Sequence, residues 1–144
     1  MRSFIKTISA LSGIILMMNI NFAYAEIALI GHTGNPEKSL TSEQVKQIFL
    51  GKTGTFPAGH KAMPVDQKDG SSLRTEFYMK ITQKDPSEIK AYWSKLIFSG
   101  KGTPPQALDS DADIKAWVAK NPAGLGYIDS KLVDGSVKLL LTVP

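Results

Sequence analysis

Short apolar runs alternate with amphipathic helical stripes along most of this chain, and that alternation limits the fold more than any other feature. The run Ile27–Gly31 is apolar and ends in glycine, which is typical of a buried strand. Val45, Ile48 and Phe49 then follow the i, i+3, i+4 spacing of a helix face. Residues 62–66 form the second strand candidate. The folded part of the chain is therefore predicted to begin as strand, helix, strand.

Three further helical stripes and two closing strands follow. The stripes consist of Leu73, Phe77 and Ile81; of Ile89, Trp93, Leu96 and Ile97; and of Ile114, Trp117 and Val118. Apolar runs at 125–128 and 137–143 predict the last two strands. The order β-α-β-α-α-α-β-β is that of an α/β domain, with a small mixed sheet flanked by about four helices. No repeat or low-complexity tract indicates a second domain.

Local signals indicate where several of these elements begin. Thr41 is followed three residues later by Gln44, which makes a capping box at a helix start. Asp85 before Pro86 predicts another capped helix start. Pro64 indicates an edge strand or the first part of a strand, because proline has no N–H group for sheet pairing.

Residues 1–25 have the pattern of a secretory signal peptide. Arg2 and Lys6 precede an apolar run at 8–20, and the small residues Ala23 and Ala25 stand at the −3 and −1 positions of a cleavage site. The run is shorter than the about 20 residues of a membrane span, although an uncleaved N-terminal anchor is the alternative. Cleavage after Ala25 leaves residues 26–144, which suffice for one domain with a modest core.

The charge and the cysteine count exclude several classes of function. Two of the 17 basic residues lie in the leader, so 15 remain against 13 acidic residues and the net charge of the rest is +2. There is no basic run or basic-aromatic stripe, so we expect no nucleic-acid partner. The chain has no cysteine, which excludes disulfides and thiol chemistry.

Gly51-Lys52-Thr53 has the composition of a nucleotide-binding loop but not its context. That loop needs a further glycine at position 46, which is Lys46 here, and it must precede a helix. The triplet instead follows the stripe that ends at Phe49. We therefore interpret Gly51 as the stop of that helix and expect no nucleotide cofactor.

Metal and catalytic patterns are equally incomplete. Asp109, Asp111 and Asp113 alternate as in a calcium loop, but Ile114 and Lys120 stand where that loop needs glycine and glutamate. The better interpretation is a set of acidic residues at a helix N-terminus. The two histidines lie apart in loops without close partners for zinc, and no Gly-x-Ser-x-Gly elbow is present. We expect no metal and no enzyme activity.

The segment Gly70-Ser71-Ser72 is the most suggestive polar motif. It is a turn of small residues directly before an amphipathic helix, where free backbone N–H groups and two hydroxyls converge. Arg74 lies in the first turn of that helix and adds a fork of donors. This pattern predicts an anion site, whereas the simpler alternative is that Ser71 or Ser72 only caps the helix.

The ordered series "SLTSEQVKQIFLGKTGTFPAGHKAMPVDQKDGSSLRTEFY", "YWSKLIFSGKGTPP" and "NPAGLGYID" resembles the phosphate-type periplasmic solute-binding proteins. The resemblance covers residues 27–143 and is strongest to a short subgroup with a single lobe. It implies an α/β fold like one lobe of these proteins for residues 26–144, a periplasmic location after signal-peptide cleavage, and service to an ATP-driven importer.

The resemblance also implies a ligand site, with two departures from the family pattern. The arginine ahead of the turn is replaced by Gln67, and the threonine that follows the serine and glycine is lost at Ser72-Leu73. Arg74 is expected to compensate, with help from the first loop. The expected site residues are Gly70, Ser71, Ser72, Arg74, Gln67, Thr33 and His32.

Two functions from different classes follow. The first is an exported protein that binds a small oxyanion, with phosphate preferred, for uptake or sensing. The second is a lobe reused as a protein-interaction module of the cell envelope, without a small ligand. A single lobe leaves an anion half solvated, so a second copy, an importer membrane subunit or another envelope protein is expected to supply the missing wall.

Overall fold

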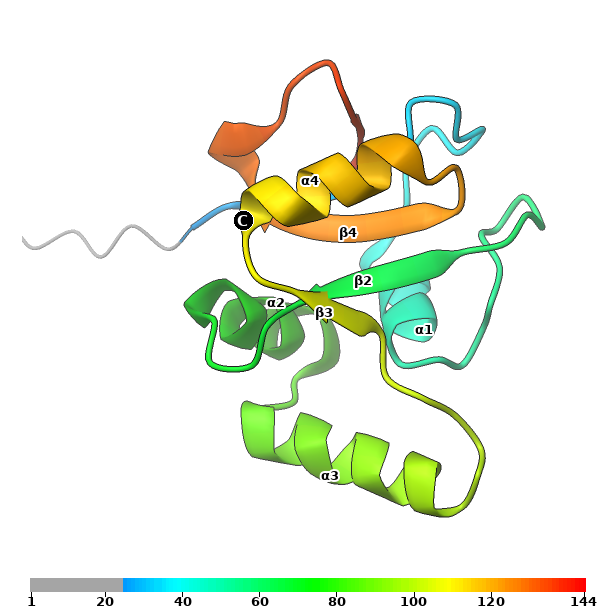
Figure 1. Ribbon diagram of the computed structural model, residues 1–144, viewed down its shortest axis with the longest axis vertical. Helices are drawn as coiled ribbons and strands as arrows, with labels where there is room; N and C mark the ends of the chain where they lie inside the picture. The colour runs from blue at the N-terminus through cyan, green and yellow to red at the C-terminus, as the bar shows by residue number, and fades with distance from the viewer. Residues whose placement is uncertain (1–24) are drawn as a thin grey trace, which may run out of the picture.

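The computed structural model describes residues 25–144. The expected signal peptide therefore lies outside the described residues, apart from its last position. The elements in chain order are β1 Ile27–Gly31, α1 Ser42–Phe49, β2 Met63–Gln67, α2 Ser72–Thr82, α3 Pro86–Phe98, β3 Gln106–Leu108, α4 Asp111–Lys120, β4 Gly124–Asp129, the 3₁₀ turn η1 Ser130–Leu132, and β5 Lys138–Val143 (Figure 1).

One mixed sheet organises the domain, in the strand order β3-β2-β4-β1-β5. β1 runs antiparallel to β4 and β5, whereas β2 runs parallel to β3 and β4. The predicted α/β fold with a small mixed sheet and four helices is therefore confirmed. Sequence patterns missed β3, because a strand of three residues is too short to show periodicity.

Pro64 illustrates how the sheet tolerates a proline. β2 lies between β3 and β4, so the prediction of an edge strand was wrong and that of a strand start was right. Pairing of β2 with β3 begins only at Val65. Pro64 therefore lies just before the first residue pair between β2 and β3, and its lack of an N–H group does not interrupt that pairing.

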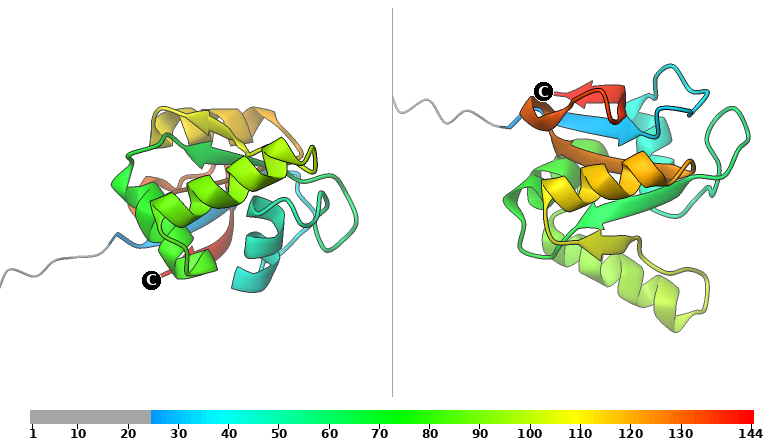
Figure 2. Two further views of the ribbon diagram at one scale, coloured as in Figure 1. Left: turned by 90° about the horizontal axis from the view of Figure 1, so that it is seen from below. Right: turned by 45° about the horizontal axis from the view of Figure 1, so that its top comes forward.

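Helices cover both faces of the sheet (Figure 2). On one face, α1, α2 and α3 enclose a core in which the rings of Phe77 and Tyr127 stack with centroids 3.8 Å apart. On the other face, α4 packs Ile114 and Val118 against the strands. Gly126 in β4 permits this approach, since a Cβ atom there would lie 2.6 Å from a methyl carbon of Ile114.

Helices α1 and α3 begin at the predicted caps, whereas α4 does not. Thr41 and Gln44 form the reciprocal bonds of a capping box, at 3.1 Å and 2.9 Å. Asp85 accepts from the backbone N–H of Glu88 at 2.8 Å. Ser110, rather than the neighbouring acidic residues, caps α4. These bonds satisfy backbone donors that the helices leave free.

Helix α3 departs from its predicted stripe. Ile89 and Trp93 are buried as expected, but Ile97 is 54% exposed and Phe98 is 95% exposed. The helix lies at the lower edge of the molecule (Figure 1), and these two side chains in its last turn are open to solvent. Among residues 25–144, no helix has the length and apolar character needed to cross a bilayer.

Candidate ligand-binding site

The turn between β2 and α2 has the features of an anion site. Gly70 adopts φ of +85°, a conformation that favours glycine, and so reverses the chain ahead of the helix. Ser71 caps α2, with its Oγ accepting from the N–H of Arg74 at 3.3 Å. Within the described chain, the N–H groups of Ser72 and Leu73 have no hydrogen-bond acceptor. Two donors at the positive end of the helix dipole are therefore free.

Arg74 lies in the first turn of α2, as the sequence predicted. Part of its guanidinium is engaged within the protein, since its Nε lies 3.4 Å from Oδ2 of Asp66 and its Nη1 lies 3.4 Å from Oδ1 of Asp69. The guanidinium also lies 5.2 Å from the ring centre of Tyr78. Burial, the largest single influence, lowers the pKa of Arg74, but the charge and hydrogen bond of Asp66 together with Tyr78 and Tyr127 outweigh it and the pKa rises. Arg74 therefore stays charged and is held by two carboxylates.

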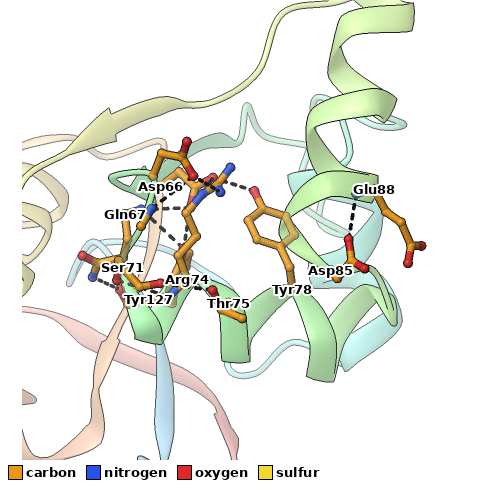
Figure 3. Close-up of polar contacts among 11 residues, drawn as sticks. Asp66, Gln67, Ser71, Arg74, Thr75, Tyr78, Asp85, Glu88 and Tyr127 are labelled. Atoms are coloured by element: carbon orange, nitrogen blue, oxygen red, sulfur yellow. Dashed lines mark hydrogen bonds and ion pairs between the residues drawn. The ribbon is translucent and has the colours of Figure 1, made fainter.

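Asp66 is the centre of a buried polar network that sequence reasoning missed (Figure 3). It is 3% exposed, and its oxygens accept from the hydroxyls of Tyr78 and Tyr127, the N–H of Gln67 and the guanidinium of Arg74. A buried carboxylate is stable only when it is paired in this way. The signal in the sequence was an acidic residue at the end of an apolar strand run.

Gln67 also faces inward rather than toward a ligand. Its Nε2 donates to Oδ1 of Asp111 at 2.6 Å and to the carbonyl of Tyr127 at 3.1 Å. The other oxygen of Asp111 accepts from the N–H of Asp129 at 3.1 Å. Gln67 therefore links β2 to β4 and α4, and its amide donors are already engaged beside the turn.

His32 and Thr33 lie far from the turn. β1 is antiparallel to β4 and β2 is parallel to β4, so the loop after β1 is at the end of the sheet where β2 begins. The turn before α2 is at the end where β2 stops, about 15 Å away for a five-residue strand. Figure 1 shows this loop at the upper right and the turn at the left. The structure does not bring the first loop to the predicted site.

The other sequence candidates have structural roles. Gly51 follows the end of α1 with φ of +68°, as expected for a helix stop. His60 stacks on Phe56 with ring centres 4.5 Å apart. Among the residues that the structure describes, no three His, Asp or Glu side chains are grouped as metal ligands.

Solved structures of transport proteins share this fold. A putative phosphate ABC transporter substrate-binding protein from Clostridium perfringens, solved with bound phosphate, is 30% identical with a TM-score of 0.65, and the match covers 81% of this chain and 45% of that chain. An ABC-type phosphate transport receptor from Vibrio cholerae is 23% identical with a TM-score of 0.64, and the match covers 81% and 46%. PstS from Borrelia burgdorferi is 14% identical with a TM-score of 0.61, and the match covers 81% and 47%.

These matches confirm the resemblance that the sequence motifs indicated, at the level of the fold. The chain spans less than half the length of each of these structures. No protein-family model matches the chain. The structure from Clostridium perfringens, at 30% identity, is described as that of a substrate-binding protein.

Proposed function

We propose that this protein is an exported, single-lobe binding protein that holds a small oxyanion, with phosphate preferred, at the N-terminus of α2. The observation that carries the proposal is the pair of free N–H groups of Ser72 and Leu73 beside the Ser71 cap. The same fold occurs in a protein from Clostridium perfringens whose structure contains phosphate. The protein acts by binding, for uptake through an ATP-driven importer or for sensing.

The arrangement favours weak binding. Arg74 and Gln67 are engaged within the protein, so the anion receives two backbone donors and the Ser72 hydroxyl in place of a fully available guanidinium. Each neutral hydrogen bond contributes about 0.5–1.5 kcal/mol. For such a half-open site we expect dissociation constants on the order of high micromolar to millimolar.

The second candidate is a protein-interaction module without a small ligand. The inward positions of Gln67 and Arg74 favour it, because both amide donors of Gln67 are engaged and Arg74 is paired with two carboxylates on the side of the turn. A second copy of the chain, an importer membrane subunit or another envelope protein is the expected partner. For the anion candidate, the partner would supply the missing wall over the turn at Gly70.

The location rests on the leader. We propose that residues 1–25 direct export to the periplasm and are removed, so that the mature chain begins at Glu26. Intact-mass measurement on protein from the periplasmic fraction should give the mass of residues 26–144. Recovery of the full 144-residue chain in the membrane fraction would show an uncleaved anchor instead.

Amide NMR titration tests the anion site. Phosphate, sulfate and nitrate are added to the wild-type protein, and the Ser72 and Leu73 resonances are expected to shift saturably at millimolar anion. Ser71→Asp should abolish these shifts, since a carboxylate then occupies the anion position while still capping the helix. Ser42→Asp, which places the same charge at the start of α1, is the matched control and should leave them intact.

The interaction-module candidate replaces the anion site under one outcome. If no amide of residues 70–74 responds at millimolar anion, in monomer or oligomer, the oxyanion proposal fails. Retention of the shifts in Ser71→Asp would also contradict it, because the anion would then bind elsewhere.

A further inference from the structure

A cavity lies between α3 and the start of α2, separate from the free N–H groups of the turn. Its volume is about 410 Å³, and its lining includes Asp69, Arg74, Lys90, Trp93, Ile97 and Pro104. This size falls within the range of about 300–1,000 Å³ that is typical of small-molecule sites. Neither Ser71 nor Ser72 lines it. A ligand in this cavity would therefore contact a different set of groups from the oxyanion proposed above.

Trp93 forms part of the cavity wall. The residue is 6% exposed, and its indole Nε1 is buried without a hydrogen-bond partner among the described residues. Because this nitrogen is itself inaccessible, Trp93 contributes its ring to the wall rather than a donor to a ligand.

Two cationic side chains supply free donors. Arg74 uses its Nε toward Asp66 and its Nη1 toward Asp69, which leaves three of its five N–H bonds without a partner in the described chain. Lys90, one turn along α3 from the helix start, has no ion pair within residues 25–144. Its three ammonium donors are therefore available.

Asp69 is the one carboxylate among the lining residues, against the two cations Arg74 and Lys90. Its Oδ1 already accepts from Arg74 and from the N–H of Gly70, and its Oδ2 is the remaining charged acceptor. The hydroxyl of Ser87 donates to Asp85 rather than into the cavity. The excess of donors favours a ligand group that is anionic and rich in acceptor oxygens.

The remaining walls are apolar. Ile89, Trp93, Ile97 and Pro104 contribute them. An indole face and aliphatic side chains stabilise a flat or branched apolar body by removing its surface from water. Inorganic phosphate or sulfate has no such body and would leave these walls uncovered.

We infer that this cavity binds a small organic anion, with its acceptor oxygens toward Arg74 and Lys90 and its apolar body against Trp93, Ile97 and Pro104. Benzoate is a suitable probe because it combines both parts. Acetate has the same anionic group without the body, and benzamide has the body without the charge. Benzoate should bind more tightly than either.

Tryptophan fluorescence measures the binding directly. The chain has two tryptophans, so Trp117→Phe leaves Trp93 as the reporter at the cavity. In this background benzoate should change the emission saturably, with acetate and benzamide at least about tenfold weaker, since a charge-assisted bond and the apolar contact each contribute at least a factor of this size. Equal responses to benzoate, acetate and benzamide would overturn the inference.

Variants locate the ligand. Lys90→Gln should weaken benzoate binding about tenfold, and Ser94→Phe, which fills the cavity from α3, should abolish it. Lys95→Gln removes the same charge from an exposed position outside the cavity and should have no effect. Unchanged affinity in both Lys90→Gln and Ser94→Phe would refute the site, provided that circular dichroism shows folded protein.

The proposals for the two sites can be tested independently of each other. Ser71→Asp should abolish the phosphate response of the Ser72 amide and leave benzoate binding unchanged. Ser94→Phe should do the reverse. Loss of both responses in both variants would instead indicate one shared site and would contradict the separate cavity.

Discussion

The hydroxyl of Tyr78 in α2 donates a hydrogen bond of 2.6 Å to Oδ2 of Asp66 in β2. The other oxygen of the same carboxylate accepts from the hydroxyl of Tyr127 in β4. One buried carboxylate therefore ties a helix to two neighbouring strands immediately before the turn that forms the candidate site. The position of Arg74 depends on the same group, because its guanidinium pairs with Asp66.

Replacing this carboxylate should destabilise the domain strongly. In Asp66→Asn, at least one donor, a tyrosine hydroxyl or the N–H of Gln67, loses its charged acceptor. Arg74 also loses its buried charged partner. We expect a loss of about 3 kcal/mol in the free energy of unfolding. Asp69→Asn is the control, since that side chain is 90% exposed and its pair with Arg74 contributes at most about 1 kcal/mol. Urea unfolding measures both, and equal losses would contradict the central role of Asp66.

Gly126 should tolerate no side chain. A Cβ atom there would lie 2.6 Å from Ile114 and 3.3 Å from both Val118 and Val65. Gly126→Ala is therefore expected to cost about 1–3 kcal/mol through overpacking between α4 and β4. Gly54→Ala, where no atom lies within 4 Å of the new methyl group, is the control and should be nearly neutral. Similar thermal denaturation midpoints for the two variants would show that α4 can shift to make room.

The sequence predicted the elements well because their local signals are strong and agree with the core. The capping box at Thr41 and the stripe of Val45, Ile48 and Phe49 appear as expected. The turn and cap at Gly70 and Ser71 also appear as expected.

The composition of the site was harder to predict, because it depends on which strands are neighbours. Only the sheet order brings Tyr127 beside Asp66, 61 residues earlier in the chain. The antiparallel course of β1 places His32 at the wrong end of the sheet, which no local pattern reveals. The pairing of Arg74 with Asp66 was equally hidden, because the two residues lie on different elements.

The two isoleucines of α3 should differ sharply in their contribution to stability. Ile89 is 1% exposed and Ile97 is 54% exposed, although both belong to the stripe that the spacing predicts. Ile89→Ala should cost about 2–5 kcal/mol, because it leaves a cavity in the core. Ile97→Ala should change stability by about 0.5 kcal/mol or less. Guanidinium unfolding compares the pair, and a large loss for Ile97→Ala would mean that the last turn of α3 is covered in solution.

High pH should destabilise the folded protein through the two buried tyrosines. Burial raises the pKa of Tyr78 and Tyr127 well above the usual range, and the neighbouring charge of Asp66 raises both further. In the unfolded chain both tyrosines titrate at about pH 10. Above that pH the unfolded state therefore releases protons that the folded state retains. The free energy of unfolding should therefore be insensitive to these groups below about pH 10 and fall above it, by about 1.4 kcal/mol per pH unit for each tyrosine.

The variant Tyr78→Phe tests this prediction. It removes one of the two buried phenols and should reduce the slope above about pH 10 by the contribution of one tyrosine, whatever its effect on stability at neutral pH. Denaturant unfolding of both proteins from neutral pH to strongly alkaline pH measures the two slopes. Identical slopes would mean that Tyr78 ionises as readily in the folded protein as in the unfolded chain, and the network around Asp66 would then be open to solvent.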